Sequence, residues 1–323
     1  IYRFGKDAMG EKFRMALEEK AKEGVEIKIL VDAWGTGAET SFFEPLIRQG
    51  VEVRVYRKMK LGKSFLSKNH CRNHRKLFVI DESIGYIGST NITAYCLNWR
   101  ELNLRTTDEN LLSILRRSFK DSFRSFERYS FSKIGTKRDL HIGDWVFIQD
   151  IPTIYRQKIK TKYERLISKA KKEIIIETPY FLPGHVLRKQ LSEAAQRGVN
   201  VIVVSPIHSD VHVVDIIRRH YLGGLHQAGV KLYFYTAGNL HAKGVMIDQE
   251  LFSISSANFD YRSFRYQYEL ALIGKEPSLI APLREHFDST LKYCNSFDFQ
   301  KWKKRSTIDK IIECILLPFR YLF

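Results

Sequence analysis

Two stretches of the sequence, HRKLFVID at residues 74–81 and HAKGVMID at residues 241–248, repeat one pattern of His, Lys and Asp. In both stretches the Lys follows two positions after the His, and an apolar run separates it from the Asp. Side chains two positions apart on a β-strand point to the same face. Each stretch therefore predicts a buried strand that presents an imidazole and an ammonium group side by side to one pocket.

The match between the two stretches continues beyond the Asp residues. Gly88-Ser89-Thr90-Asn91 follows the first stretch and Ser255-Ser256-Ala257-Asn258 follows the second, and the spacing from His to Asn is 17 residues in both. Glu101 lies 27 residues after the first His, and Glu269 lies 28 residues after the second. Six residue types that recur in order at matched spacing indicate an internal duplication.

The duplication extends to the secondary structure expected upstream of each His. A helical stretch, a Gly-Val pair and an apolar strand occur in that order twice in each half of the chain. The expected strands lie at residues 24–31, 51–56, 198–204 and 230–235. Helices that alternate with Val- and Ile-rich strands are typical of α/β proteins with mainly parallel sheets. Two copies of this pattern predict a bilobal fold with pseudo-two-fold symmetry.

The repeat also predicts how the chain divides. We expect a first lobe at residues 1–140, a second at residues 141–300, and a basic, amphipathic segment at residues 301–323. Tyr2 aligns with Tyr180, and the helix and strand expected before Tyr180 have no counterparts before Tyr2. We therefore expect the first lobe to be truncated, with the matching elements upstream of Ile1.

Composition narrows the class of protein. The 323 residues are 44% hydrophobic and carry a formal net charge of +17, which implies an anionic partner: a phosphate-rich lipid surface, a nucleic acid or an acidic protein. Charge alone does not choose among these partners. The four cysteines form no Cys-x-x-Cys pair, so neither a zinc site nor a disulfide scaffold is expected.

Each recurring residue type has a role in phosphodiester chemistry. A neutral His attacks phosphorus, and a second, protonated His donates a proton to the leaving alkoxide. His74 and His241 are the candidates, and the repeat alone does not decide which takes which role. A carboxylate that hydrogen-bonds the far ring nitrogen orients each imidazole. Glu101 and Glu269 are the candidates for that orienting role.

The other repeated residues are candidates for binding the phosphate and for supporting the strands. Cations and amides stabilise non-bridging oxygens in the transition state, and we expect this from Lys76, Lys243, Asn91 and Asn258. Ser89 and Ser256 are further candidate phosphate contacts, although a turn serine can also serve only the backbone. Asp81 and Asp248 complete the catalytic motifs as structural supports. Because no carboxylate cluster is available for a two-metal site, we expect neither metal nor cofactor.

These motifs resemble those of the phospholipase D superfamily and, within it, of the bacterial cardiolipin synthases. The resemblance runs almost from end to end and rests on Asn73-His74-Arg75-Lys76, Gly88-Ser89-Thr90-Asn91, Trp99-Arg100-Glu101, Pro179-Tyr180-Phe181-Leu182-Pro183, Ala195-Gln196-Arg197-Gly198-Val199 and Leu240-His241-Ala242-Lys243. It implies a bilobal α/β/α sandwich that needs no metal and works through a covalent phosphohistidine. The chain departs from the family in reading Ser-Ser-Ala-Asn at residues 255–258, and it shows no membrane-spanning helix at its beginning.

The resemblance implies a transphosphatidylase that joins two molecules of phosphatidylglycerol into cardiolipin and glycerol, with His74 as nucleophile and His241 as acid and base. It also implies a place at the membrane, on the cytoplasmic face of a bacterial inner membrane. Three alternatives stay open: a phospholipase D that releases phosphatidic acid, a nuclease that uses the same site, and an inactive lipid-binding module. Intact motifs in both halves argue against the last.

Two segments combine cations with bulky apolar residues, as anionic lipid interfaces require. One is an insertion at residues 57–72, and the other is the segment at residues 301–323, which is too short and too charged to span a bilayer. For the insertion the alternative is an ordinary solvated loop. For the second segment the alternative is a last helix that packs on the protein body.

Overall fold

The computed structural model describes residues 1–37, 41–56, 71–126 and 139–323. The insertion at residues 57–72 therefore lies almost wholly outside the described residues. The first half has the order α1 (Ala8–Lys22), β1 (Lys28–Asp32), α2 (Ala33–Thr36), η1 (Ser41–Phe43), α3 (Glu44–Arg48), β2 (Glu52–Tyr56), β3 (Arg72–Asn73), β4 (Leu77–Ile80), β5 (Ile84–Gly88), η3 (Ala94–Cys96), β6 (Asn103–Thr106) and α4 (Glu109–Arg124).

The second half repeats this order and adds elements at both ends. Its elements are β7 (Leu140–Ile142), β8 (Trp145–Asp150), α5 (Lys158–Lys169), β9 (Glu173–Glu177), α6 (His185–Gln196), β10 (Asn200–Pro206), α7 (His212–Gln227), β11 (Lys231–Tyr235), β12 (Gly244–Ile247), β13 (Leu251–Ser255), α8 (Tyr261–Tyr266), β14 (Gln267–Gly274), α9 (Pro277–Leu291), β15 (Cys294–Ser296), α10 (Phe299–Lys303), α11 (Thr307–Leu316) and η4 (Leu317–Leu322). The α/β class and the phospholipase-D-like architecture are as the sequence predicts.

The sheets contain strands of both directions, which corrects the expectation of mainly parallel sheets. The largest sheet has the order β15-β11-β10-β9-β12-β13-β14-β8-β7, with β3 beside β14. Strands β9, β10 and β11 run parallel, but β12, β13, β14 and β8 alternate in direction. Short turns join β12 to β13 and force an antiparallel pair. Because these antiparallel strands are buried on both faces, they are continuous apolar runs in the sequence. Such runs are typical of parallel sheets, which is why the sequence predicts mainly parallel strands.

The corresponding strands of the first half form two smaller sheets. Among the described residues, β1 pairs with β2, and β4, β5 and β6 form a separate sheet. In the second half β9 lies between the corresponding strands β10 and β12. The strand expected before Tyr2 and the domain boundaries at residues 140 and 300 remain predictions.

One part of the sequence alignment is off by a residue. Phe4 forms a bridge with Ile92, and Phe181 forms the equivalent bridge with Phe259. Since Ile92 and Phe259 each follow the motif Asn, Tyr180 matches Arg3 rather than Tyr2. Tyr2 and Phe4 are both aromatic, so the sequence alone does not fix which residue matches Tyr180. The backbone bridges of Phe4 and Phe181 fix the match.

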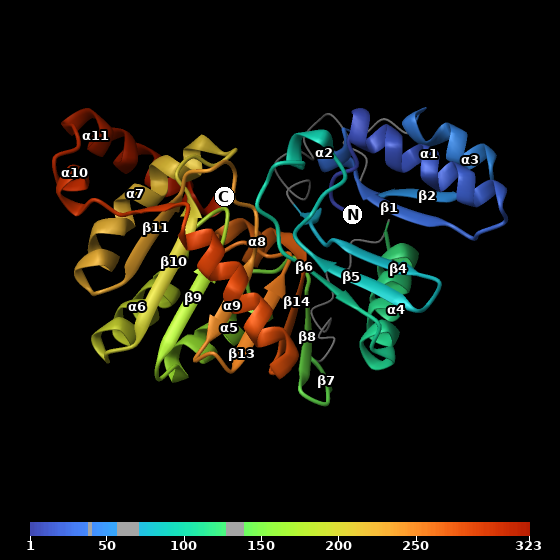
Figure 1. Ribbon diagram of the computed structural model, residues 1–323. Helices are drawn as coiled ribbons and strands as arrows, with labels where there is room; N and C mark the ends of the chain where they lie inside the picture. Colours follow the sequence, from blue (N-terminus) through green and yellow to red (C-terminus); the bar gives the residue numbers. More distant parts are fainter. Residues whose placement is uncertain (38–40, 57–70, 127–138) are drawn as a thin grey trace.

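The two halves lie side by side and share a core (Figure 1). One hydrophobic cluster contains buried residues of both halves, including Ile87 and Leu104 from the first and Ile175 and Leu270 from the second. This shared core fixes the two motif-bearing strands relative to each other. In the part of the chain that the structure describes, no helix is long and apolar enough to cross a bilayer.

Candidate active site

Each motif strand enters the site by pairing with the other half of the chain. Asn73 pairs with Tyr268, and the His74 amide donates a hydrogen bond of 3.1 Å to the Tyr268 carbonyl. In the mirror arrangement Leu240 pairs with Arg100, and the His241 amide donates a hydrogen bond of 2.8 Å to the Arg100 carbonyl. Because Tyr268 and Arg100 each precede a motif Glu, the pairing brings each Glu to the His of the opposite half.

The glutamates accordingly orient the histidines across the two halves. His74 Nδ1 lies 2.9 Å from Glu269 Oε1, and His241 Nδ1 lies 2.8 Å from Glu101 Oε1. Both imidazoles are buried, at 6% relative exposure each. With Nδ1 engaged by a carboxylate, the second ring nitrogen of each His is left for chemistry. The sequence identifies both glutamates as orienting residues, but it does not show that each one binds the histidine of the opposite half.

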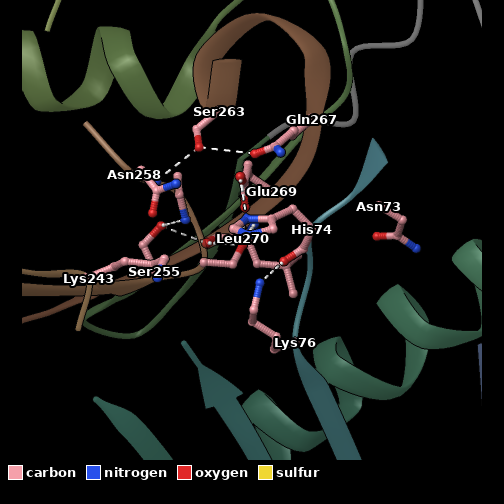
Figure 2. A network of polar contacts seen from close by, with 12 residues as sticks. Asn73, His74, Lys76, Lys243, Ser255, Asn258, Ser263, Gln267, Glu269 and Leu270 are labelled. Atoms are coloured by element: carbon pink, nitrogen blue, oxygen red, sulfur yellow. Dashed lines mark hydrogen bonds and ion pairs between the residues drawn. The ribbon is translucent and has the colours of Figure 1, made fainter. Parts of the chain in front are cut away.

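The two motif lysines, which directly precede β4 and β12, are held by the backbone of their own motifs. Lys76 Nζ donates to the His74 carbonyl and Lys243 Nζ donates to the His241 carbonyl, both over 2.7 Å. Both lysines are 2% exposed. Figure 2 shows His74 and Lys76 of the first half beside Glu269, Asn258 and Lys243 of the second. The predicted pairing of imidazole and ammonium therefore occurs twice, around one centre.

A single cavity of about 480 Å³ receives both imidazoles. Its walls come from both halves, and the motif residues on them are His74, Asn91, His241 and Asn258. Asn91 Oδ1 accepts a hydrogen bond of 3.2 Å from the Arg3 amide. Asn258 is 4% exposed, and its Oδ1 atom has no hydrogen-bond partner among the residues that the structure describes. An amide left incompletely satisfied at a cavity wall is suited to a polar ligand.

Aromatic rings pack against both catalytic candidates. The Tyr2 ring meets the His74 ring edge-on at 4.9 Å, and the Trp99 ring lies 5.1 Å from the His241 ring. Asp210 joins the halves on the cavity wall, because its carboxylate accepts hydrogen bonds from Tyr95 (2.9 Å) and Tyr180 (2.5 Å). The Tyr2 and Trp99 rings lower the polarity around the two imidazoles and restrict the rotation of the imidazole rings.

In the free enzyme, burial and the nearby cations lower the pKa of both histidines. Burial, followed by the charges of Lys76, Lys243 and His241, lowers the pKa of His74 well below its usual range. Burial and Lys243 also lower the pKa of His241, but Glu101 opposes that shift. Burial lowers the pKa of Lys76 to about 7 and that of Lys243 to about 8, with the other motif lysine adding to the shift of Lys76. An anionic phosphate entering this cavity reverses these shifts and favours the charged lysines.

The two glutamates differ in charge state. Burial raises the pKa of Glu269 to about 7, against the opposing effect of Lys76. Burial alone would raise the pKa of Glu101, but the charge and hydrogen bond of His241 together with Lys243 lower it to about 2. At neutral pH His241 therefore faces an ionised carboxylate. Burial favours the protonated form of the carboxyl group that faces His74.

The two motif serines lie behind the glutamates rather than against the cavity. Ser256 donates to Glu269 Oε2 and accepts a hydrogen bond of 2.9 Å from the Leu270 amide. Ser89 accepts a hydrogen bond of 2.9 Å from the Leu102 amide and donates one of 3.1 Å to the Leu102 carbonyl. Both serines are completely buried. The serines thus support Glu269 and the neighbouring strand backbone, and their expected phosphate contact remains a prediction.

The motif aspartates, for which a structural role is expected, lie in tight turns. Asp81 and Asp248 both have positive φ, as do the residues that follow them. The bonds from the Ser83 amide to the Ile80 carbonyl and from the Glu250 amide to the Ile247 carbonyl close turns of type I′. Asp is among the few residues that tolerate this backbone conformation. The Asp248 carboxylate also accepts hydrogen bonds from the amides of residues 171–173.

The donors gathered here are imidazoles, ammonium groups and amides. Within the described residues, no group of three or more His, Cys, Asp or Glu side chains is placed to hold a metal ion. Sequence reasoning missed Tyr95, Trp99, Tyr180 and Asp210 as parts of the cavity wall. Trp99 and Tyr180 stand in quoted motif segments, but nothing in the sequence pointed to Asp210.

Comparison with known proteins identifies relatives over nearly the whole chain. A family model described as cardiolipin synthase, PLD-like domain, matches residues 1–123 and 163–291. A cardiolipin synthase of Clostridium perfringens is 31% identical, covering 98% of this chain and 69% of its own. The major cardiolipin synthase of Bacillus subtilis is also 31% identical, covering 97% of this chain and 67% of its own.

Among solved structures, phosphatidylserine synthase of Haemophilus influenzae superposes with a TM-score of 0.78 at 12% identity, covering 99% of this chain and 88% of that one. Polyphosphate kinase of Porphyromonas gingivalis superposes with a TM-score of 0.63 at 13% identity, covering 99% of this chain and 48% of that one. These likenesses bear on the fold alone.

Proposed function

The chain belongs to the phospholipase-D-like cardiolipin synthase family, and we propose that it joins two phosphatidylglycerol molecules into cardiolipin and glycerol through a phosphohistidine. The observation that carries the proposal is the crossed arrangement of two His–Glu pairs on one cavity. Such a cavity can hold one phosphorus between two imidazoles. It serves in-line attack from one side and departure on the other.

We assign the nucleophile to His74. Burial and the surrounding cations favour its neutral form, which has the free lone pair that attack on phosphorus requires. Its Nδ1 proton is directed to Glu269, so the other ring nitrogen carries the lone pair. Attack forms the bond from this nitrogen to phosphorus and breaks the bond from phosphorus to the glycerol oxygen.

We assign the proton transfers to His241. Ionised Glu101 stabilises the imidazolium form, and the anionic substrate adds to this effect. His241 donates its proton to the departing glycerol oxygen and becomes neutral. It then accepts a proton from the terminal hydroxyl of a second phosphatidylglycerol. That oxygen attacks the phosphohistidine, and the bond between His74 and phosphorus breaks to release cardiolipin.

The charge on the transferred phosphate is met by Lys76, Lys243, Asn91 and Asn258. Lysines at the back of a buried site stabilise the developing negative charge more strongly than exposed ones, because little water screens them. None of these steps routes a charge through a metal. Turnover should therefore continue in excess EDTA, apart from effects of divalent ions on the lipid surface itself.

Product analysis by mass spectrometry tests the proposal directly. Vesicles of phosphatidylglycerol should yield cardiolipin and glycerol in equal amounts, and His74→Ala and His241→Ala should yield neither. Release of phosphatidic acid without cardiolipin would establish hydrolysis instead. Cleavage of single-stranded DNA with inert vesicles would establish the nuclease alternative. Addition of phosphatidylethanolamine to the vesicles shows whether a second phospholipid supplies or accepts the phosphatidyl group.

The same proposal places the enzyme at a membrane surface, since both substrates are bilayer lipids. We further propose that it acts on the cytoplasmic face of a bacterial inner membrane. Separation of membranes from soluble protein, followed by protease treatment of right-side-out vesicles, tests that placement.

A further inference from the structure

Helix α11 has its apolar side turned outward. Ile308, Ile311, Ile312 and Ile315 recur at helical spacing and are exposed by 69%, 52%, 40% and 61%. On the opposite side of the same helix Glu313 is 1% exposed. A terminal helix that merely covers a protein core buries its isoleucines and exposes its glutamate. The observed orientation is the reverse.

This orientation is fixed by specific contacts. Arg305 binds Glu313 through two parallel hydrogen bonds of 2.9 Å and 3.0 Å, and its guanidinium also stacks on the Trp302 ring. Trp302 Nε1 donates a hydrogen bond of 2.8 Å to the Arg219 carbonyl on α7. A buried, paired glutamate cannot leave its arginine without a large cost. The helix is therefore held with its isoleucines facing outward.

The chain beyond α11 leads from these isoleucines to the catalytic cavity. Phe319 and Leu322 in η4 are 52% and 46% exposed, which extends the apolar surface. Phe323 lines the cavity, and its carbonyl accepts a hydrogen bond of 2.8 Å from the Arg262 amide. In Figure 1 α10 and α11 lie at the outer end of the second half, and the C-terminus lies between them and α2, another element of the cavity wall.

Positive charge borders the same surface. Lys301, Lys303 and Lys304 precede α11 and are exposed, and Lys310 lies exposed within it. Isoleucines and phenylalanine beside a cluster of lysines match the chemistry of an anionic bilayer surface, where apolar groups enter the acyl boundary and cations meet phosphates. A second copy of this chain would bring the same cations together and repel itself.

We propose that the outward face of α11 and η4 is the surface by which the enzyme docks on an anionic bilayer, with the cavity mouth against the lipid headgroups. The proposal deepens the proposed function, because it rests on bilayer lipids being the substrates. It names Ile308, Ile311, Ile312, Ile315, Phe319 and Leu322 as the inserting side chains. For residues 301–323 it combines the two sequence alternatives, since the segment packs on the body and keeps an apolar face free.

The experiment compares two double variants of the full chain. Ile311→Ser with Ile315→Ser removes docking residues, whereas Val25→Ser with Ile80→Ser removes two exposed apolar side chains of similar exposure elsewhere (42% and 47%). Co-sedimentation with vesicles of equal phosphatidylglycerol and phosphatidylcholine measures docking. Turnover of a water-soluble nitrophenyl phosphodiester measures the active site without a bilayer. Thermal unfolding confirms that both variants are folded.

We expect vesicle binding of the docking variant to weaken at least about tenfold, since two apolar side chains no longer enter the bilayer. The control variant should bind like the wild type, and both should turn over the soluble substrate within about twofold of wild type. Lys303→Glu with Lys304→Glu should weaken binding to the phosphatidylglycerol vesicles and leave binding to pure phosphatidylcholine unchanged.

Equal vesicle binding by the docking and control variants would overturn the proposal, even with full activity on the soluble substrate. Light scattering supplies a second way to overturn it. A wild-type dimer that the Ile variant dissociates, with vesicle binding unchanged, would make this face a contact between copies. Failure of wild-type turnover on both vesicles and soluble substrate would defeat the proposed function instead, while the binding comparison would still decide docking.

Discussion

The two halves present the same six residue types in the same geometry, yet they give the two histidines different electrostatic surroundings. Each His is oriented by a Glu of the opposite half at nearly equal distance. The Glu269 side chain is completely buried, however, while that of Glu101 keeps 11% of its exposure. Burial raises the pKa of Glu269 to about 7, whereas His241 and Lys243 lower that of Glu101 to about 2.

This difference shows that geometry and charge are set by different parts of the chain. The repeated motif fixes the crossed geometry, because the residues that pair across the halves are the neighbours of His and Glu. Charge depends also on how deeply each His–Glu pair is buried, and this burial differs between the two halves. A symmetric frame can thus hold one neutral nucleophile and one proton donor.

The largest expected contrast comes from neutralising each glutamate in turn. Glu101→Gln should lower kcat on the order of 10²-fold, because the amide keeps the geometry and removes the charge that stabilises His241 as an acid. Glu269→Gln should lower it only about tenfold, since its carboxyl group already carries a proton part of the time. Steady-state turnover of phosphatidylglycerol vesicles measures both. Equal losses would mean that the two halves do not differ in charge as described.

The pH dependence sharpens the comparison through the lysines. A lysine whose pKa is lowered is charged below that pKa and loses its charge as the pH rises through it. With pKa values of about 7 for Lys76 and about 8 for Lys243 in the free enzyme, kcat/KM on the soluble phosphodiester should fall across pH 7–9. Lys76→Arg should move the beginning of this fall upward, because arginine stays charged.

Lys243→Arg serves as the matched control for that shift, since it should move only the later part of the fall. A profile that stays flat to pH 9 in the wild-type enzyme would show that neither lysine loses its charge in this range. The fall on the acidic side should lie well below the usual pKa of a histidine, because burial and nearby cations lower the pKa of His74.

The smallest contrast concerns the motif aspartates and involves stability rather than turnover. Asp248→Ala should lower the free energy of unfolding by about 1–2 kcal/mol, because three backbone amides lose their acceptor. Asp81→Ala should cost about 0.5 kcal/mol, since Asp81 is an exposed turn residue. Both variants should keep turnover within about threefold of wild type. Urea unfolding measures the first effect, and a hundredfold loss of turnover in either variant would give the aspartates a chemical role.

How far the sequence predicts this molecule depends on the distance over which each feature is encoded. The α/β class, the bilobal repeat and the motif residues follow from local patterns and their spacing. The crossing of Glu101 to His241 and of Glu269 to His74 depends on strand pairing between segments 140 and 195 residues apart, which no local pattern specifies. The strand directions could not be predicted for a related reason. Strands joined by hairpins and strands joined by crossovers are both apolar runs, so the local sequence does not distinguish antiparallel from parallel pairing.

The outward isoleucines of α11 are a further case. Their helical spacing is plain in the sequence and predicts an amphipathic helix. It does not say which face meets the protein, because that depends on the Arg305–Glu313 pair and on Trp302. The positions of Asp210 and the rings that bind it were likewise visible only once both halves were placed around one cavity.

The central claim is that His74 forms the covalent bond and His241 moves the protons. A labelled nitrophenyl phosphodiester lipid tests it, because nitrophenolate leaves without a proton from the enzyme. His241→Ala should then accumulate labelled phosphatidyl-enzyme and release it slowly, whereas His74→Ala should trap no label. Trapping by His74→Ala alone would reverse the assignment. Absence of label in both variants, with wild-type turnover intact, would contradict the covalent route.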